Sequence, residues 1–182
     1  MNENISNLLS AVRGKAYREG DFTLASGQKS SYYIDLKEVT LDGEGSLLIG
    51  KAIYPIALEW GVEAVGGMEL GAVPISTAVC LVAAMEKTAF RNIIVRKAPK
   101  GHGTQKMVEG ALQPGMKVAV VEDVVSTGGS SLKAVQILRE AGAQVAGIIS
   151  VVDRLMGGEK LFEQEGIQYR YLLDINQIRD AR

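Results

Sequence analysis

The sequence has a single cysteine, Cys80, among its 182 residues. One cysteine excludes a disulfide within the chain and any metal site built from a cysteine cluster. No apolar run approaches the ~18 residues that a membrane helix requires, and the first residues lack the basic segment of a signal peptide. We therefore expect a cytoplasmic protein that has no membrane partner.

The sequence also lacks an excess of either charge, with 20 Lys and Arg against 21 Asp and Glu. A general nucleic-acid binder needs a basic face, so we expect no nucleic-acid partner. Proline is scarce, with 4 residues, whereas the 21 glycines gather at the ends of apolar runs. In α/β proteins, ligands bind at these ends of the strands.

Apolar runs alternate with segments of helical spacing through the middle of the chain. The runs lie at 62–65, 92–95, 117–121 and 145–152, and the helical segments at 42–60, 74–86 and 129–141. This alternation predicts an α/β fold with a mainly parallel central sheet flanked by helices. Residues 22–24 and 31–35 predict a short hairpin ahead of it. The length fits a single domain, residues 1–182, with a core at about 41–155.

The clearest chemical pattern is at residues 120–130, where an apolar strand runs into Glu122 and Asp123. A loop of hydroxyl residues and glycines follows, and then a helix. Loop amides and a helix N-terminus form a site suited to phosphate, and strand-end carboxylates can accept hydrogen bonds from a ribose. The alternative is an ordinary strand–turn–helix with a Ser or Thr cap and solvated acids. We favour the binding site because all these features occur together.

A second pattern is the cationic segment 96–103, which contains Arg96, Lys97, Lys100 and the only histidine, His102. A glycine-rich cationic loop can close over a pyrophosphate and exclude water from it. The alternative is a solvated basic loop. Its position, one strand before the phosphate pattern, favours a role in binding.

Residues 118–130 match, position by position, the phosphoribosyl-pyrophosphate (PRPP) signature of type I phosphoribosyltransferases. The pattern Arg-Lys-x-x-Lys-x-His-Gly at 96–103 resembles the flexible loop of the orotate phosphoribosyltransferases within that family. Three further stretches are similar to the same family: 22–33 to its N-terminal hood, 66–74 to its pyrophosphate loop, and 152–154 to a strand end that carries an orotate-binding Arg. The resemblance covers about residues 20–155.

This resemblance implies the type I phosphoribosyltransferase fold, with a small N-terminal hood formed by about residues 1–40 and the C-terminal segment. It implies transfer of ribose 5-phosphate from PRPP to orotate, giving orotidine 5′-phosphate and diphosphate in pyrimidine synthesis. It also implies Mg²⁺ as the cofactor, held mainly through substrate oxygens rather than by protein ligands. It further implies a homodimer in which the segment Arg96 to His102 reaches the neighbouring subunit's site.

The resemblance assigns roles to individual residues. The expected catalytic residues are Lys100, Asp123 and Glu122, and the expected orotate-binding residues are Ser126 and Arg154. The expected PRPP-binding residues are Arg96, Lys97, Lys100, His102, Glu122, Asp123, Val124, Val125, Ser126, Thr127, Gly128, Gly129 and Ser130.

The sequence departs from the family at two positions. Many members have Lys where this chain has Ala25, and a Lys or an aromatic residue around Leu70 and Gly71. We expect neither position to contribute to the site. Two alternatives remain: a transferase for another base, such as a purine, and a non-catalytic regulator that senses PRPP. A regulator often carries a DNA-binding domain or a basic face, and this chain offers neither.

Overall fold

The computed structural model describes residues 2–23, 29–99 and 106–181. A six-stranded sheet forms the centre, in the order β5-β4-β3-β6-β7-β8. Its strands are β3 (Ala64–Met68), β4 (Arg91–Val95), β5 (Val108–Glu109), β6 (Lys117–Val125), β7 (Gln144–Asp153) and β8 (Tyr169–Asp174). Neighbouring strands pair in parallel apart from β5, which pairs antiparallel with β4. The predicted α/β fold with a mainly parallel sheet is confirmed.

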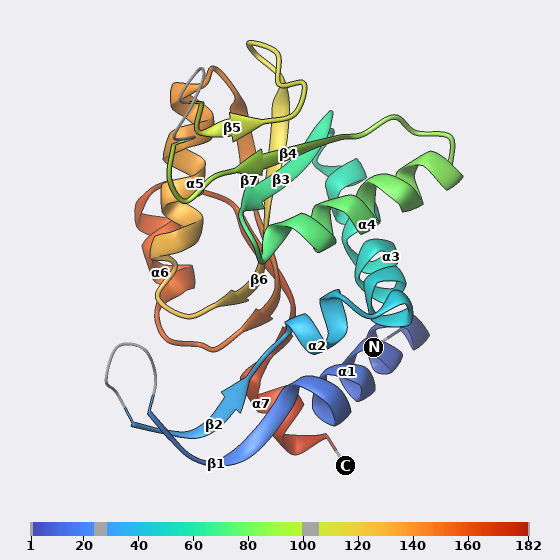
Figure 1. Ribbon diagram of the computed structural model, residues 1–182, viewed down its shortest axis with the longest axis vertical. Coiled ribbons are helices and arrows are strands. Elements are labelled where there is room, and N and C mark those ends of the chain that lie inside the picture. The colour runs from blue at the N-terminus through green and yellow to red at the C-terminus, as the bar shows by residue number, and fades with distance from the viewer. Residues whose placement is uncertain (1, 24–28, 100–105, 182) are drawn as a thin grey trace.

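Helices cover both faces of this sheet (Figure 1). The helices α3 (Gly43–Glu59) and α4 (Ala72–Met85) lie on one face, and α5 (Gly129–Glu140) and α6 (Gly158–Gln164) lie on the other. Side chains of β6 alternate between the two layers, since Val118 and Val120 join the core beneath α5 whereas Ala119 and Val121 join the core beneath α3 and α4. An apolar run buried on both faces is typical of a central parallel strand.

The N-terminal region forms a separate two-stranded antiparallel sheet from β1 (Tyr17–Thr23) and β2 (Lys29–Ile34). The helix α1 (Glu3–Ala11) and the π-helix η1 (Val12–Ala16) precede it, and the short helix α2 (Lys37–Thr40) follows it. The C-terminal helix α7 (Ile175–Asp180) lies beside this region (Figure 1). Leu8 and Val12 share one core with Ile175 and Ile178. The N- and C-terminal segments thus lie together, and a hood within a single domain stays a prediction.

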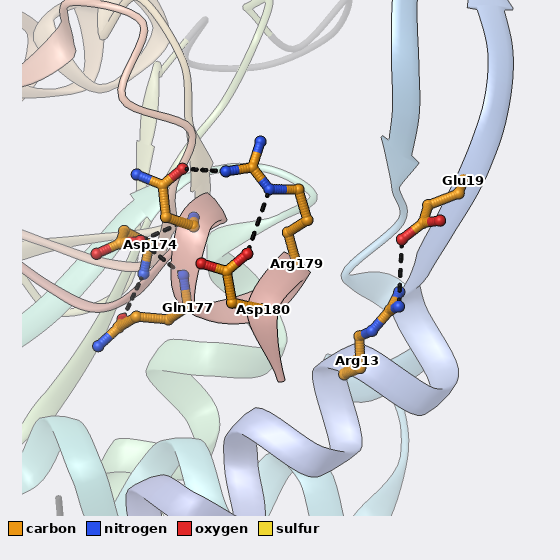
Figure 2. Close-up of polar contacts among 7 residues, drawn as sticks. Arg13, Glu19, Asp174, Gln177, Arg179 and Asp180 are labelled. Atoms are coloured by element: carbon orange, nitrogen blue, oxygen red, sulfur yellow. Dashed lines mark hydrogen bonds and ion pairs between the residues drawn. The ribbon is translucent and has the colours of Figure 1, made fainter. Parts of the chain in front are cut away.

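Polar contacts fix the ends of these peripheral elements, as Figure 2 shows. Asp174 caps α7 and accepts hydrogen bonds from the backbone N–H groups of Asn176 and Gln177, and the Gln177 side chain accepts one from the Asp174 N–H. This reciprocal capping box satisfies N–H groups that a helix start otherwise leaves without partners. Arg13 donates to Glu19 and ties η1 to β1.

The structure differs from the sequence predictions at the ends of the strands. β6 continues to Val125 instead of ending near residue 121, because β7 extends alongside it and pairs Glu122 with Ser150. β3 includes Gly66 and Gly67, which the sequence placed after the strand. A Cβ at Gly66 would lie 1.8 Å from the carbonyl oxygen of Ile93, so this central position requires glycine. β5 lies between the predicted strands at 92–95 and 117–121, in a stretch where the sequence analysis predicted no strand.

No helix within the described ranges combines the length and the apolar character needed to cross a membrane.

Candidate active site

A pocket of about 410 Å³ opens where β3 and β6 end. The carboxyl ends of neighbouring parallel strands are the usual place for a ligand in this kind of sheet. The lining residues come from β6, the β3–α4 connection, α2, the end of β4 and the start of α5: Lys37, Met68, Glu69, Leu70, Gly71, Lys97, Glu122, Asp123, Val124 and Ser130.

Five predicted site residues are therefore brought together in this pocket: Lys97, Glu122, Asp123, Val124 and Ser130. The remaining described members of the prediction lie outside this lining: Arg96, Val125, Ser126, Thr127, Gly128, Gly129 and Arg154. Lys100 and His102 fall outside the described residues.

Asp123 is the half-buried carboxylate of the pocket. Its Oδ1 accepts a hydrogen bond of 2.8 Å from the N–H of Val124. A Cβ at Gly71 would lie only 2.7 Å from that same oxygen, so the absence of a side chain at Gly71 makes room for the carboxylate. The hydrogen bond to Asp35 raises the pKa of Lys37, and the charge of Asp123 adds to this effect. Lys37 therefore supplies a cation to the Asp123 side of the pocket.

Glu122 is much less accessible than Asp123, with 6% of its surface exposed. Adjacent residues of a strand point to opposite faces of the sheet, and the Oε2 atom of Glu122 accepts a hydrogen bond of 3.2 Å from Ser131 on α5. Burial, together with the charge of Asp123, raises the pKa of Glu122 to about 8. The two acids of the sequence pattern thus have different environments.

The helix α5 begins after the short loop that follows β6, and no side chain caps its start. Its N-cap is Gly128, which has a left-handed backbone (φ 84°). The first N–H groups of a helix have no acceptor within the helix, and they carry the positive end of its dipole. This uncapped end favours an anion next to Ser130. It also excludes the Ser or Thr cap that the ordinary strand–turn–helix interpretation required.

The loop between β6 and α5 is held by backbone and packing contacts. The carbonyl of Val125 accepts a hydrogen bond from the N–H of Arg154, and that of Ser126 accepts one from Gly158. A Cβ at Gly128 would lie 2.8 Å from ring atoms of the buried Phe162. The uncapped end of α5 therefore packs against α6.

Arg96 and Lys97, the described cations of the segment 96–103, follow the end of β4. The Arg96 guanidinium forms an ion pair of 3.7 Å with Glu109 of β5. The N–H of Lys97 donates to Oε1 of Glu69 at 3.0 Å, so the segment starts at the rim of the pocket. The side chain of Lys97 lines the pocket and is exposed.

Arg154 connects the core to the N-terminal sheet. Its Nε donates to the hydroxyl of Tyr32 at 3.2 Å, and its guanidinium carbon lies 5.0 Å from the centre of the Tyr32 ring. Its Nη1 also donates to Oγ of Ser126 at 3.4 Å. The two predicted orotate-binding residues, Ser126 and Arg154, are therefore in contact.

The model of the Phosphoribosyl transferase domain family matches residues 46–172. Orotate phosphoribosyltransferase from Aquifex aeolicus is 45% identical over 97% of this chain and 96% of the relative. The enzyme of the same description from Synechocystis sp. is 48% identical, over 96% of this chain and 88% of the relative. The chain belongs to the orotate phosphoribosyltransferase family. The predicted family and the activity that defines it, transfer of the phosphoribosyl group from PRPP to orotate, are confirmed at this level.

A solved structure of the family agrees with the fold. The crystal structure of Mycobacterium tuberculosis H37Rv orotate phosphoribosyltransferase in complex with PRPP has a TM-score of 0.82 and 33% sequence identity, covering 97% of this chain and 99% of that chain. Both the six-stranded sheet and the small N-terminal sheet therefore belong to an orotate phosphoribosyltransferase fold.

Sequence reasoning missed three residues around this site: Tyr32, Lys37 and Glu69. Tyr32 lies in the stretch 22–33 that resembled the family hood, so the signal was present but was not assigned to one residue. Glu69 precedes Leu70 and Gly71, where the departure from the family led us to expect no contribution, yet all three residues line the pocket. Lys37 follows no local pattern, since only the placement of α2 brings it to Asp123.

Proposed function

We propose that the chain joins orotate to PRPP in the pocket between β3, β6 and α5, releasing diphosphate and forming orotidine 5′-phosphate. The observation that carries this assignment is the placement of Asp123 and Glu122 beside the uncapped N-terminus of α5. This arrangement supplies acceptors for ribose hydroxyls at the end of a strand and donors for a phosphate at the start of the next helix. The single loop between the two elements separates the acceptors from the donors.

In the proposed reaction, the bond between ribose C1 and the diphosphate oxygen breaks while C1 forms a bond to a ring nitrogen of orotate, and the proton of that nitrogen passes to the departing diphosphate, directly or through water. Positive charge develops on the ribose and negative charge on the departing diphosphate. Enzymes lower such barriers chiefly by positioning and by fixed charges aimed at the developing charge. The catalytic machinery of this chain is accordingly composed of hydrogen-bonding and charged groups.

Each group of PRPP has a matching set of residues. The residues at 126–130 hold the 5′-phosphate through hydroxyl groups and the first N–H groups of α5. Asp123 and Glu122 accept hydrogen bonds from the ribose hydroxyls. The cationic segment meets the diphosphate, with Lys100 as the residue that stabilises the leaving group, and with Arg96, Lys97 and His102 beside it.

Arg154 and Ser126 hold the orotate base in this proposal. A guanidinium pairs with a carboxylate through two parallel hydrogen bonds, which a uracil or purine base cannot accept in the same way. The stacking of Tyr32 on the guanidinium and the hydrogen bond that Arg154 donates to Ser126 support this role, because both restrict the orientation of Arg154 before a ligand arrives.

The pocket also fits Mg²⁺ as a partner of PRPP. Mg²⁺ prefers one or two carboxylates together with substrate phosphate oxygens, and the lining supplies oxygens from Asp123, Glu122 and Glu69. In the described part of the chain, no group of three or more His, Cys, Asp or Glu side chains forms a metal site by itself. Substrate oxygens would therefore supply most of the ligands, and the bound ion would neutralise charge on the diphosphate.

We also propose that the chain forms a homodimer through an apolar face of α3 and α4. A groove there is lined by Leu47, Leu81 and Met85, which are 41%, 62% and 73% exposed. A patch of exposed apolar side chains is typical of an interaction surface. The α4 residues of this groove, from Ala78 to Met85, lie toward the end of the helix, whereas the pocket rim is at its start after Gly71. Leu81→Lys should give a monomer by sedimentation velocity.

A base panel tests the proposed reaction. Orotate, uracil, adenine, hypoxanthine and guanine are each incubated with PRPP, Mg²⁺ and the protein, and diphosphate release is followed. We expect release with orotate alone. Diphosphate release with a purine, and none with orotate, would establish the alternative base. A failure to release diphosphate with any of the five bases would favour the non-catalytic regulator.

A further inference from the structure

Behind Arg154 lies a buried polar cluster that the proposed reaction does not use. Asp153, the last residue of β7, is 1% exposed. Its Oδ1 accepts a hydrogen bond of 2.6 Å from the N–H of Leu155, and its Oδ2 accepts one of 2.7 Å from the Tyr169 hydroxyl. The Tyr169 oxygen is also 2.7 Å from Oγ of Ser150, which is fully buried.

Donor chemistry fixes the direction of this chain of bonds. An ionised carboxylate only accepts, and a phenol has one proton to give. The Tyr169 proton therefore goes to Asp153, and the Ser150 hydroxyl must donate to Tyr169. Burial raises the pKa of Tyr169, so its hydroxyl keeps the proton through the neutral range. The buried carboxylate is thus satisfied by neutral donors, and losing one of them is costly.

These bonds restrain the backbone on both sides of Arg154. Its own N–H donates to the carbonyl of Val125 at 2.9 Å. The next residue, Leu155, has a left-handed backbone with φ of 55°, a conformation that a non-glycine residue keeps only when its surroundings hold it. The bond from the Leu155 N–H to Asp153 supplies that restraint.

We propose that Asp153, Tyr169 and Ser150 form a buried support that orients Arg154, and that this support sets the affinity for the substrate carboxylate. Asp153 and Tyr169 are positioning residues, since they act through the Arg154 backbone. This proposal rests on the proposed role of Arg154 in binding orotate. It predicts that damage to the support affects orotate and spares PRPP, whose groups are assigned to β6, α5 and the cationic segment.

The test substitutes Tyr169→Phe, which removes the donor to Asp153 and keeps the ring. The matched control is Tyr171→Phe, two residues along the same strand, where the side chain is 36% exposed. We expect Tyr169→Phe to raise the KM for orotate about tenfold, the scale of an unsatisfied buried acceptor. The KM for PRPP should change less than about twofold, and the control should change neither.

A double-mutant cycle separates positioning from general damage. If Tyr169 acts through Arg154, then adding Tyr169→Phe to Arg154→Ala should raise the orotate KM no further. An additional tenfold rise in that background, or an equal rise in the KM values of both substrates, would overturn the proposal. If Tyr169→Phe does not fold, Ser150→Ala replaces it in the test. We expect Ser150→Ala to raise the KM for orotate about threefold and to leave the KM for PRPP unchanged. An unchanged KM for orotate would contradict the proposal.

The outcome for Arg154→Ala alone keeps the two proposals apart. A large rise in the orotate KM with Arg154→Ala, and none with Tyr169→Phe, would overturn the support while leaving the role of Arg154 intact. An unchanged orotate KM with Arg154→Ala would overturn both.

Discussion

The two sides of the pocket differ in how firmly contacts among the described residues hold their side chains. On the β6 side, Glu122 is bonded to Ser131, Asp123 fits against Gly71, and the loop before α5 rests on Phe162. On the opposite side, Lys97 is exposed and bonded only through its backbone N–H in the contacts described. Folding alone thus presets the two carboxylates and the uncapped start of α5, whereas the side chain of Lys97 stays exposed.

The largest expected effect comes from the preset side. Asp123→Asn keeps the shape of the side chain but removes its charge from the ribose site. We expect kcat to fall by about 10²- to 10³-fold, the scale for losing one preorganised electrostatic contact. Circular dichroism should show an intact fold, and Asp180→Asn, which lies on the exposed helix α7, should keep full turnover. Unchanged turnover of Asp123→Asn would mean that the acid is a solvated strand end.

Substitution of Arg154 tests whether folding also places the residue proposed to bind orotate. We expect Arg154→Ala to weaken orotate binding by ~2–4 kcal/mol, as for loss of a charged hydrogen-bonding partner. Binding of PRPP should hardly change. Isothermal titration with each ligand measures both, and Arg170→Ala, an exposed arginine paired with Glu59, serves as the control. Equal losses for the two ligands would contradict the assignment to the base.

The buried state of Glu122 should appear in the pH dependence of stability. Its pKa is raised from 4.5 to about 8 by burial, with Asp123 adding to the effect. Between these values the folded state keeps a proton that the unfolded state releases, so the free energy of unfolding falls as pH rises. Glu122→Gln cannot ionise and should lose this part of the fall.

Urea denaturation of both proteins at pH 5 and at pH 8 measures the difference. Between pH 5 and pH 8, we expect the free energy of unfolding of the wild type to fall by ~1–2 kcal/mol more than that of Glu122→Gln. This is part of the full linkage value of ~1.4 kcal/mol per pH unit. The exposed Glu38→Gln should follow the wild type. Parallel curves for Glu122→Gln and wild type would show that Glu122 is ionised throughout.

The smallest effect on stability is expected on the cationic side. The ion pair of Arg96 with Glu109 has side chains that are 29% and 35% exposed, and such pairs contribute only ~0–1 kcal/mol. Arg96→Ala should therefore leave the melting temperature within a few degrees of wild type, while the KM for PRPP rises about tenfold. Arg91→Ala, an exposed arginine at the start of β4, should change neither value.

Local patterns in the sequence predicted the preset side well. The apolar run at 117–121 is buried on both faces, and Glu122, Asp123 and Ser130 after it line one pocket. Both features depend on residues close together in the chain. The true end of β6 at Val125 was missed because it depends on pairing with β7, which no pattern within residues 117–130 reveals.

Contacts between distant segments could not be predicted from the sequence. Tyr32 meets Arg154 across 122 positions of the chain, and Lys37 reaches the pocket through the packing of α2. The support behind Arg154 joins β7 to β8 through Tyr169. The local spacing of apolar residues indicates on which face of its strand Tyr169 lies but not which residues it contacts. Such pairs follow from topology, which hydrophobic periodicity does not encode.

A mixed-dimer experiment tests most directly whether the segment from Arg96 to His102 completes the neighbouring subunit's site, as the family resemblance implies. Lys100→Ala and Asp123→Asn should each be nearly inactive alone, for different reasons. In a mixed dimer one site would carry both defects and the other neither. Random exchange of equal amounts makes about half of the dimers mixed, so about a quarter of wild-type diphosphate release should return. No recovery, with subunit exchange verified by mass spectrometry, would show that the segment serves its own chain's site.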